Sequence, residues 1–109
     1  MILSTIRMAI PLKKRDEALK ILKMTAEYCK VRAGCLSCHI YEDVQDAKVI
    51  MLKEMWRSGE DLEQHLRSDE YRNILLVMEM AEKEPELRFD KISGSTGIET
   101  VEKARSPNR

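Results

Sequence analysis

The amino-acid sequence predicts an α+β fold of the ferredoxin-like type, with the element order βαββαβ and a four-stranded antiparallel sheet. Two observations support this fold. Segments that alternate apolar and polar residues, as strands do, are interleaved with segments that place an apolar residue every three or four positions, as helices do. With 109 residues, the chain has room for one domain. We expect this domain to span residues 1–94 and residues 95–109 to form a partly flexible tail.

The first strand and the first helix are separated by Pro11. Residues Ile2 to Ile10 alternate, with Thr5 and Arg7 on the polar face. From Lys14 to Arg32 the spacing becomes helical, and Gly34 is expected to close this helix. The inward side chains expected on it are Ala18, Leu19, Ile21, Leu22, Met24, Thr25, Tyr28 and Cys29.

Two further strands are expected on either side of a polar loop at residues 43–47. The first covers Cys35 to Glu42 and the second covers Lys48 to Arg57. The second strand is apolar on both faces. One face carries Ile50, Leu52 and Trp56, and the other carries Val49, Met51 and Met55.

The second helical region is predicted to be broken in two. Ser58 and Asp61 form a capping-box pattern, which starts a short helix that buries Leu62, His65 and Leu66. A further helix is expected from Asp69 to Lys83, and Pro85 separates it from a last strand at Leu87–Ser93. Its inward residues are expected to be Tyr71, Ile74, Leu75, Met78 and Ala81. In the tail, Ile98–Ala104 has the pattern of one or two helical turns.

The second apolar face of the strand at residues 48–57 requires a cover, because the helices of this chain pack on one face of the sheet only. A large contiguous apolar sheet face is unusual on a monomer. The simplest cover is the same face of a second copy around a two-fold axis. We therefore expect a homodimer in which two sheets pack face to face as a barrel.

Charge and composition exclude several classes of partner. Lys and Arg total 19 and Asp and Glu total 19, so no excess of positive charge favours nucleic acid. The sequence lacks a run of about 18 apolar residues and an export-signal pattern, so no membrane partner is expected. These features indicate a cytoplasmic protein whose three cysteines stay reduced.

His65 is the best candidate for acid–base chemistry, because it lies on the inward face of a predicted helix. Histidine ordinarily has a pKa of about 6.5, and a positioned base raises a reaction rate roughly 10²- to 10⁴-fold. Glu54 and Trp56 lie near the end of the preceding strand and are expected to shape the same pocket. The alternative is that His65 is structural, hydrogen-bonded to Glu54 or to backbone, and that Trp56 is an ordinary core residue.

Three further residues could bind a substrate. Tyr41, Tyr71 and Arg7 are candidates for orienting a hydroxylated ring or a carboxylate. Each of them is otherwise explained as a packing or surface residue.

The segment Cys35-Leu36-Ser37-Cys38-His39 has the C-x-x-C-H pattern of covalent haem attachment. In a regular strand, Cys35, Ser37 and His39 face one way while Leu36 and Cys38 face the other. The two cysteines would then lie roughly 10 Å apart, beyond the limit of about 7 Å for a disulfide. A zinc site would need more ligands, and Cys29 and His65 are the obvious additional ones. We therefore expect neither a metal nor another cofactor.

Three segments resemble the antibiotic biosynthesis monooxygenase family, whose members are dimeric α+β barrels. They are Gly34-Cys35-Leu36 through Tyr41, Glu54-Met55-Trp56-Arg57-Ser58, and Leu62-Glu63-Gln64-His65-Leu66 followed by Ser68. The resemblance covers residues 2–93. It implies oxidation of quinols or polyphenols by molecular oxygen without a metal or a flavin. Related proteins degrade haem, but where that branch has Asn, Trp and His this sequence has Ile6, His65 and Leu75.

The first hypothesis is therefore a cofactor-independent monooxygenase acting on a small aromatic quinol or polyphenol, with His65 as the base. The second is a non-catalytic dimeric module of the same fold that binds a small molecule or nothing. An isomerase acting on a small phosphorylated carbonyl compound is the least supported, because Arg57 and Arg67 are expected to face solvent.

Overall fold

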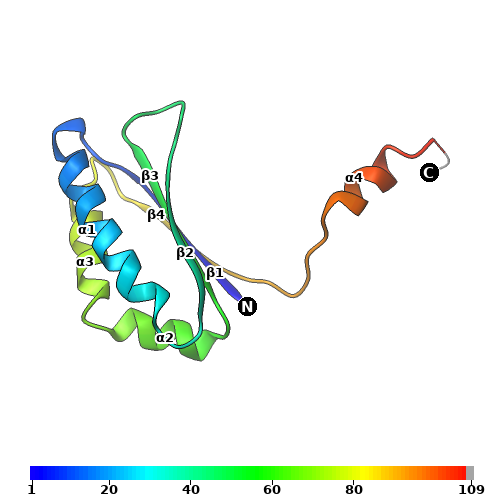
Figure 1. Cartoon of the computed structure of the whole chain (residues 1–109). Coiled ribbons are helices and arrows are strands. Elements are labelled where there is room, and N and C mark those ends of the chain that lie inside the picture. Colours follow the sequence, from blue (N-terminus) through cyan, green and yellow to red (C-terminus); the bar gives the residue numbers. More distant parts are fainter. Residues whose placement is uncertain (108–109) are drawn as a thin grey trace.

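Four antiparallel strands form one sheet, in the order β2-β3-β1-β4, and the helices of the domain lie against one of its faces (Figure 1). The computed structural model describes residues 1–107. Its elements are β1 (Ile2–Ala9), α1 (Leu12–Lys30), β2 (Cys35–Glu42), β3 (Val49–Trp56), α2 (Gly59–Arg67), α3 (Tyr71–Glu79), β4 (Glu86–Lys91) and α4 (Ile98–Ala104). The predicted α+β, ferredoxin-like fold is confirmed, including the break between α2 and α3.

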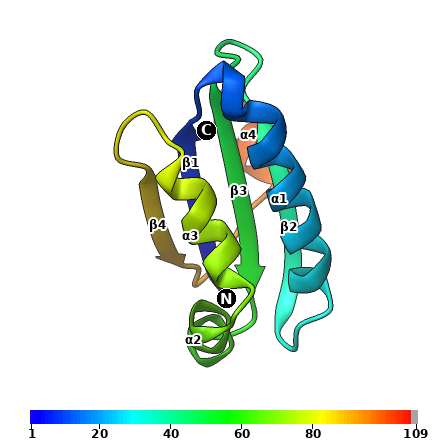
Figure 2. The same ribbon diagram turned by 90° about the vertical axis from the view of Figure 1, so that its left-hand side faces the viewer.

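The core lies between the sheet and its helices. Helices α1 and α3 run side by side over the sheet, and α2 lies at one end of this layer (Figure 2). The side chains that fill the space come from β1, β3 and all three of these helices. Those with no exposed surface include Ile6, Ile10, Ala18, Ile50, Trp56, Ile74 and Val77.

The apolar stripes of α1 and α3 are narrower than predicted. Met24 and Tyr28 are 52% and 53% exposed, and Leu75 is 47% exposed, so their assignment to the core was wrong. A helix turns about 100° per residue, so Met24 lies roughly 200° around α1 from the buried Leu22. On α3 it is Val77, three positions after Ile74, that is buried instead.

Gly34 does not close α1, contrary to the prediction. The helix ends at Lys30, and Gly34 lies in the following turn with a φ of 84°, a conformation that glycine adopts without strain. The Gly34 carbonyl accepts a hydrogen bond of 2.8 Å from the Arg57 N–H. A Cβ atom at this position would lie 2.2 Å from the Cγ atom of Asp61. Gly34 therefore lets the start of β2 approach α2.

Replacing Gly34 by alanine is expected to destabilise the protein by about 2–4 kcal/mol, because the positive φ and the clash with Asp61 each cost free energy. Urea unfolding measures the loss. Gly59→Ala is the matched control, since a Cβ at Gly59 meets nothing within 4 Å and alanine favours a helix. Equal unfolding midpoints for the two variants would contradict this account.

Strand β2 contains a bulge at Leu36, which has no partner on β3. Cys35 pairs with Trp56 and Cys38 pairs with Glu54, so both thiols are on the side of the sheet that faces the helices. Cys38 is 1% exposed, whereas Leu36 is 53% exposed. The prediction that Cys35 and Cys38 face opposite ways was wrong, because it assumed strict alternation along the strand.

The other face of the sheet is not covered by any helix of residues 1–107. We call it the open face; its central side chains are Thr5, Arg7, Tyr41, Met51, Lys53 and Met55. The predicted division of β3 into two faces is confirmed. Beyond β4, the chain leaves the domain on this side, and α4 stands apart from the sheet (Figures 1 and 2). Ile98 and Val101 of α4 are 67% and 50% exposed.

The described part of the chain contains no helix with both the length and the apolar character that crossing a membrane requires.

Candidate functional site

His65 is held inside the protein by the short helix α2. The helix starts as predicted, since the Ser58 hydroxyl accepts a hydrogen bond of 3.2 Å from the Asp61 N–H. One face of α2 packs inward, and on it His65 has no exposed surface. Glu54 reaches the same place from β3, where its register partners are Ser4 on β1 and Cys38 on β2. It is 1% exposed, which is unusual for a carboxylate.

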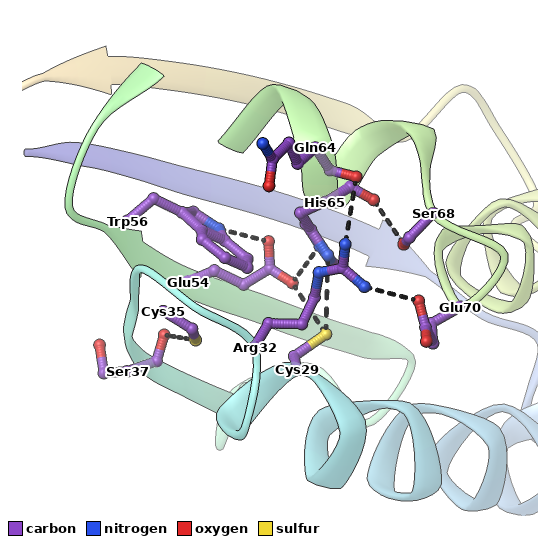
Figure 3. Close-up of polar contacts among 10 residues, drawn as sticks. All are labelled: Cys29, Arg32, Cys35, Ser37, Glu54, Trp56, Gln64, His65, Ser68 and Glu70. Atoms are coloured by element: carbon purple, nitrogen blue, oxygen red, sulfur yellow. Dashed lines mark hydrogen bonds and ion pairs between the residues drawn. The ribbon is translucent and has the colours of Figure 1, made fainter. Parts of the chain in front are cut away.

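Glu54 is the centre of a buried polar cluster (Figure 3). Its Oε2 atom lies 3.1 Å from His65 Nε2, and its Oε1 atom accepts a hydrogen bond of 3.3 Å from the Trp56 indole N–H. The Trp56 ring stacks on the His65 ring with 4.5 Å between centroids. The Tyr71 ring meets His65 edge-on at 5.2 Å. Four of the six predicted site residues therefore lie together.

Cys29 completes the cluster from α1. Its Sγ atom lies 3.9 Å from Glu54 Oε2 and 3.9 Å from His65 Nδ1. A hydrogen bond with Cys38, together with burial and the nearby charge of Glu54, raises the pKa of the Cys29 thiol far above its ordinary value. Burial likewise raises the pKa of Tyr71 to about 12. Both groups are therefore neutral at physiological pH.

Sequence reasoning considered Cys29 only as an additional zinc ligand and did not place it beside Glu54 and His65. The available signal was its position at the end of the inward stripe of α1. The contact itself depends on how α1 crosses the sheet, which periodicity does not specify.

Contacts at the end of α2 fix the position of His65. The Ser68 hydroxyl donates a hydrogen bond of 2.6 Å to the His65 carbonyl. Arg32, in the turn after α1, pairs with Glu70 at 3.1 Å and also reaches the Gln64 carbonyl at 3.5 Å (Figure 3). Within residues 1–107, every buried side-chain nitrogen and oxygen has a hydrogen-bond partner.

Arg7 and Tyr41 do not join this cluster. They lie on the open face, where they line a cavity of about 130 Å³ together with Glu42, Asp43, Val49 and Met51. Arg7 lies 3.9 Å from Asp43 and 3.8 Å from Glu86 across this surface. The six predicted residues are thus divided between the two faces of the sheet.

A second cavity, of about 220 Å³, opens beside the bulge of β2. It is lined by Lys30, Cys35, Leu36, Ser37, Cys38 and His39. Cys38 connects it to the buried cluster, because Cys38 pairs with Glu54 across the sheet. His65, Glu54 and Trp56 line neither cavity.

Comparison with known proteins places the chain in a family. A family model described as antibiotic biosynthesis monooxygenase matches residues 1–75. The chain belongs to this family. Members of the antibiotic biosynthesis monooxygenase family are typically dimeric. No protein of curated function is detectably similar in sequence.

Solved structures share the fold of this family member. A conserved protein from Methanosarcina mazei is 24% identical, with a TM-score of 0.78 over 83% of this chain and 90% of its own. An antibiotic biosynthesis monooxygenase is 16% identical, with a TM-score of 0.78 over 86% of this chain and 100% of its own. A Mycobacterium tuberculosis protein is 18% identical, with a TM-score of 0.79 over 88% of this chain and 98% of its own. These likenesses establish the fold.

Proposed function

We propose that this family member is a cofactor-independent monooxygenase that oxidises a small aromatic quinol or polyphenol. His65 takes the proton of a substrate hydroxyl, and the electron-rich phenolate passes an electron to molecular oxygen. Recombination of superoxide with the ring radical forms a C–O bond, giving a hydroperoxide. Loss of water from the hydroperoxide breaks the O–O bond and leaves a carbonyl. The substrate supplies all four electrons, so no reductant is needed.

The observation that supports this proposal most directly is the buried contact of 3.1 Å between His65 and Glu54. A carboxylate beside an imidazole stabilises the imidazolium that forms when the base takes a proton. The pair lies among the aromatic rings of Trp56 and Tyr71, and a low-dielectric surrounding strengthens its electrostatic effects.

Substrate must gain access to a histidine that has no exposed surface. We propose that α2 moves to admit it, because this helix has only nine residues and carries His65 itself. Closure of a short element over bound substrate is a common way to exclude water from a reaction.

Oxygen consumption tests the proposal. The purified protein, treated with a chelator, is incubated with a panel of quinols, catechols and fused-ring polyphenols in an oxygen electrode. We expect consumption of one oxygen molecule per molecule of quinone-type product, without added flavin, metal or reductant. A protein that consumes no oxygen above the uncatalysed rate with any member of the panel would be better described as a non-catalytic module.

The non-catalytic alternative has its own support. His65, Glu54 and Trp56 are at most 1% exposed and pair with one another, as residues that only stabilise a core do. In that case a quinol would neither be consumed nor change the thermal stability of the protein.

We further propose that two copies of the chain pair through the open face. Its central residue Met51 lies between Arg7 and Tyr41, and α4 stands on the same side (Figure 1). An aspartate at Met51 would bury a charge between the two sheets. Met51→Asp is therefore expected to convert a dimer into a monomer at micromolar concentration, measured by sedimentation velocity.

Leu76→Asp is the matched control for Met51→Asp. Leu76 is 48% exposed on α3, on the other side of the domain. This variant is expected to remain dimeric. A monomeric wild-type protein at the same concentration would refute pairing through the open face.

A further inference from the structure

We propose that Cys29, Glu54 and His65 form a binding site for a divalent transition-metal cation of the zinc type. This inference goes beyond the oxygenase and does not depend on it. The three side chains come from α1, β3 and α2, so folding alone brings them together. A cation bound to His65 Nε2 would replace the contact of this atom with Glu54, on which the base depends, so the two roles exclude each other at any one moment.

The donor atoms lie close enough together to hold a metal ion after small movements. One sulfur, one oxygen and one ring nitrogen lie within 4.8 Å of one another. Zinc binds sulfur at about 2.3 Å and nitrogen or oxygen at about 2.0–2.2 Å, so tetrahedral ligands lie roughly 3.3–3.6 Å apart. Glu54 Oε2 lies 3.1 Å from His65 Nε2 and 3.9 Å from Cys29 Sγ. Adjustments of a few tenths of an ångström bring these two distances to those values. The Cys29 sulfur and the histidine nitrogen, which lie within 4.8 Å of each other, must also move closer together.

The charges of the cluster also favour a divalent cation. A bound cation would displace the proton of the Cys29 thiol, and the resulting thiolate and the carboxylate of Glu54 would together carry two negative charges, which a divalent ion neutralises. Buried charges of this kind require pairing or a metal. No lysine or arginine within residues 1–107 forms an ion pair with Glu54; its ion-pair partner is His65.

The donor types select among metals. Thiolate and imidazole suit zinc and related transition metals, whereas magnesium and calcium require sets of oxygen ligands. Cysteine, histidine and carboxylate are the three side chains that zinc uses in proteins. The second ring nitrogen of His65 and the second oxygen of Glu54 remain for hydrogen bonds, and Trp56 already donates one to Glu54.

The cavity beside the bulge of β2 lies next to the site. Cys38 lines this cavity of about 220 Å³ and pairs with the ligand Glu54 across the sheet. This arrangement depends on the bulge, which turns Cys38 toward the helices.

Cobalt(II) binding to the whole reduced protein tests the site without substrate or oxygen. Cobalt replaces zinc in tetrahedral sites and absorbs visibly, and a thiolate ligand adds a near-ultraviolet charge-transfer band. We expect both features to saturate at one cobalt per chain and to disappear when zinc is added. A wild-type protein that binds no cobalt, or binds it without the thiolate band, would overturn the proposal.

Single substitutions identify which cysteine binds the metal. Cys29→Ser is expected to abolish the thiolate band and to weaken zinc binding at least tenfold, while circular dichroism confirms that the variant is folded. Cys35→Ser is the matched control, since the Cys35 thiol is partly exposed and hydrogen-bonds the Ser37 carbonyl. It is expected to keep the wild-type spectrum. Loss of the band in Cys35→Ser with retention in Cys29→Ser would place the metal elsewhere and refute this site.

The outcomes separate this proposal from the oxygenase. Cobalt binding by a protein that consumes no oxygen would support the metal site and count against the enzyme. A protein that consumes oxygen in the presence of a chelator and fails to bind cobalt would support the enzyme and refute the metal site.

Discussion

Replacing His65 by alanine is expected to lower the rate of oxygen consumption roughly 10²- to 10⁴-fold, the usual contribution of a positioned general base. The loss should appear mainly in kcat, because His65 acts on the proton that leaves in the reaction. The measurement is steady-state oxygen consumption with the best quinol of the panel, in the presence of a chelator.

Two further measurements distinguish a base from a structural histidine. Free imidazole is expected to restore part of the rate of His65→Ala, since it fits the space left beside Glu54. His39→Ala is the matched control, because the other histidine of the chain is exposed on β2. It is expected to keep the wild-type rate. A His65→Ala protein that is less stable but turns over normally would show that His65 only supports the fold.

Replacing Glu54 by alanine is expected to destabilise the protein by about 3–5 kcal/mol, as removal of one partner of a buried pair does. The carboxylate is 1% exposed and interacts with His65, Trp56 and Cys29, so all three donors would lose their acceptor. Glu54→Gln keeps the volume and part of the hydrogen bonding, and should cost less, about 1–2 kcal/mol. Urea unfolding at neutral pH measures both.

An exposed glutamate provides the comparison for Glu54. Glu17 lies on the solvent side of α1, and Glu17→Ala is expected to change stability by no more than about 0.5 kcal/mol. If Glu54→Ala unfolds at the same urea concentration as Glu17→Ala, the buried cluster contributes little to stability.

Most of the fold could be predicted from the sequence because its signals are local. Alternation, helical spacing and the Ser58 cap were sufficient for the strands, the break between α2 and α3, and the short helix at Ile98–Ala104. The errors about which helix residues are buried have one cause. The rotational position of a helix against a sheet, which exposes Met24 and Leu75, is set by packing partners that lie far away in the sequence.

Part of the candidate site could also be predicted, because some of its residues are close together in the sequence. Glu54 and Trp56 are two residues apart on one strand and share a face, and His65 follows on the next helix. The contact among these three side chains therefore joins residues that are close in the sequence. Arg7 and Tyr41 were grouped with them by residue type, although the pleat directs both to the open face. The contact of Cys29 with this cluster depends on tertiary structure alone.

The bulge at Leu36 has a consequence for how relatives of this chain should be aligned. A homologue lacking one residue here could have a straight second strand and still direct the side chain equivalent to Cys38 toward the glutamate. Gap placement at this point therefore decides whether a thiol, a hydroxyl or an aliphatic group is assigned to the interior. Alignments that ignore it would miscount which homologues retain the sulfur.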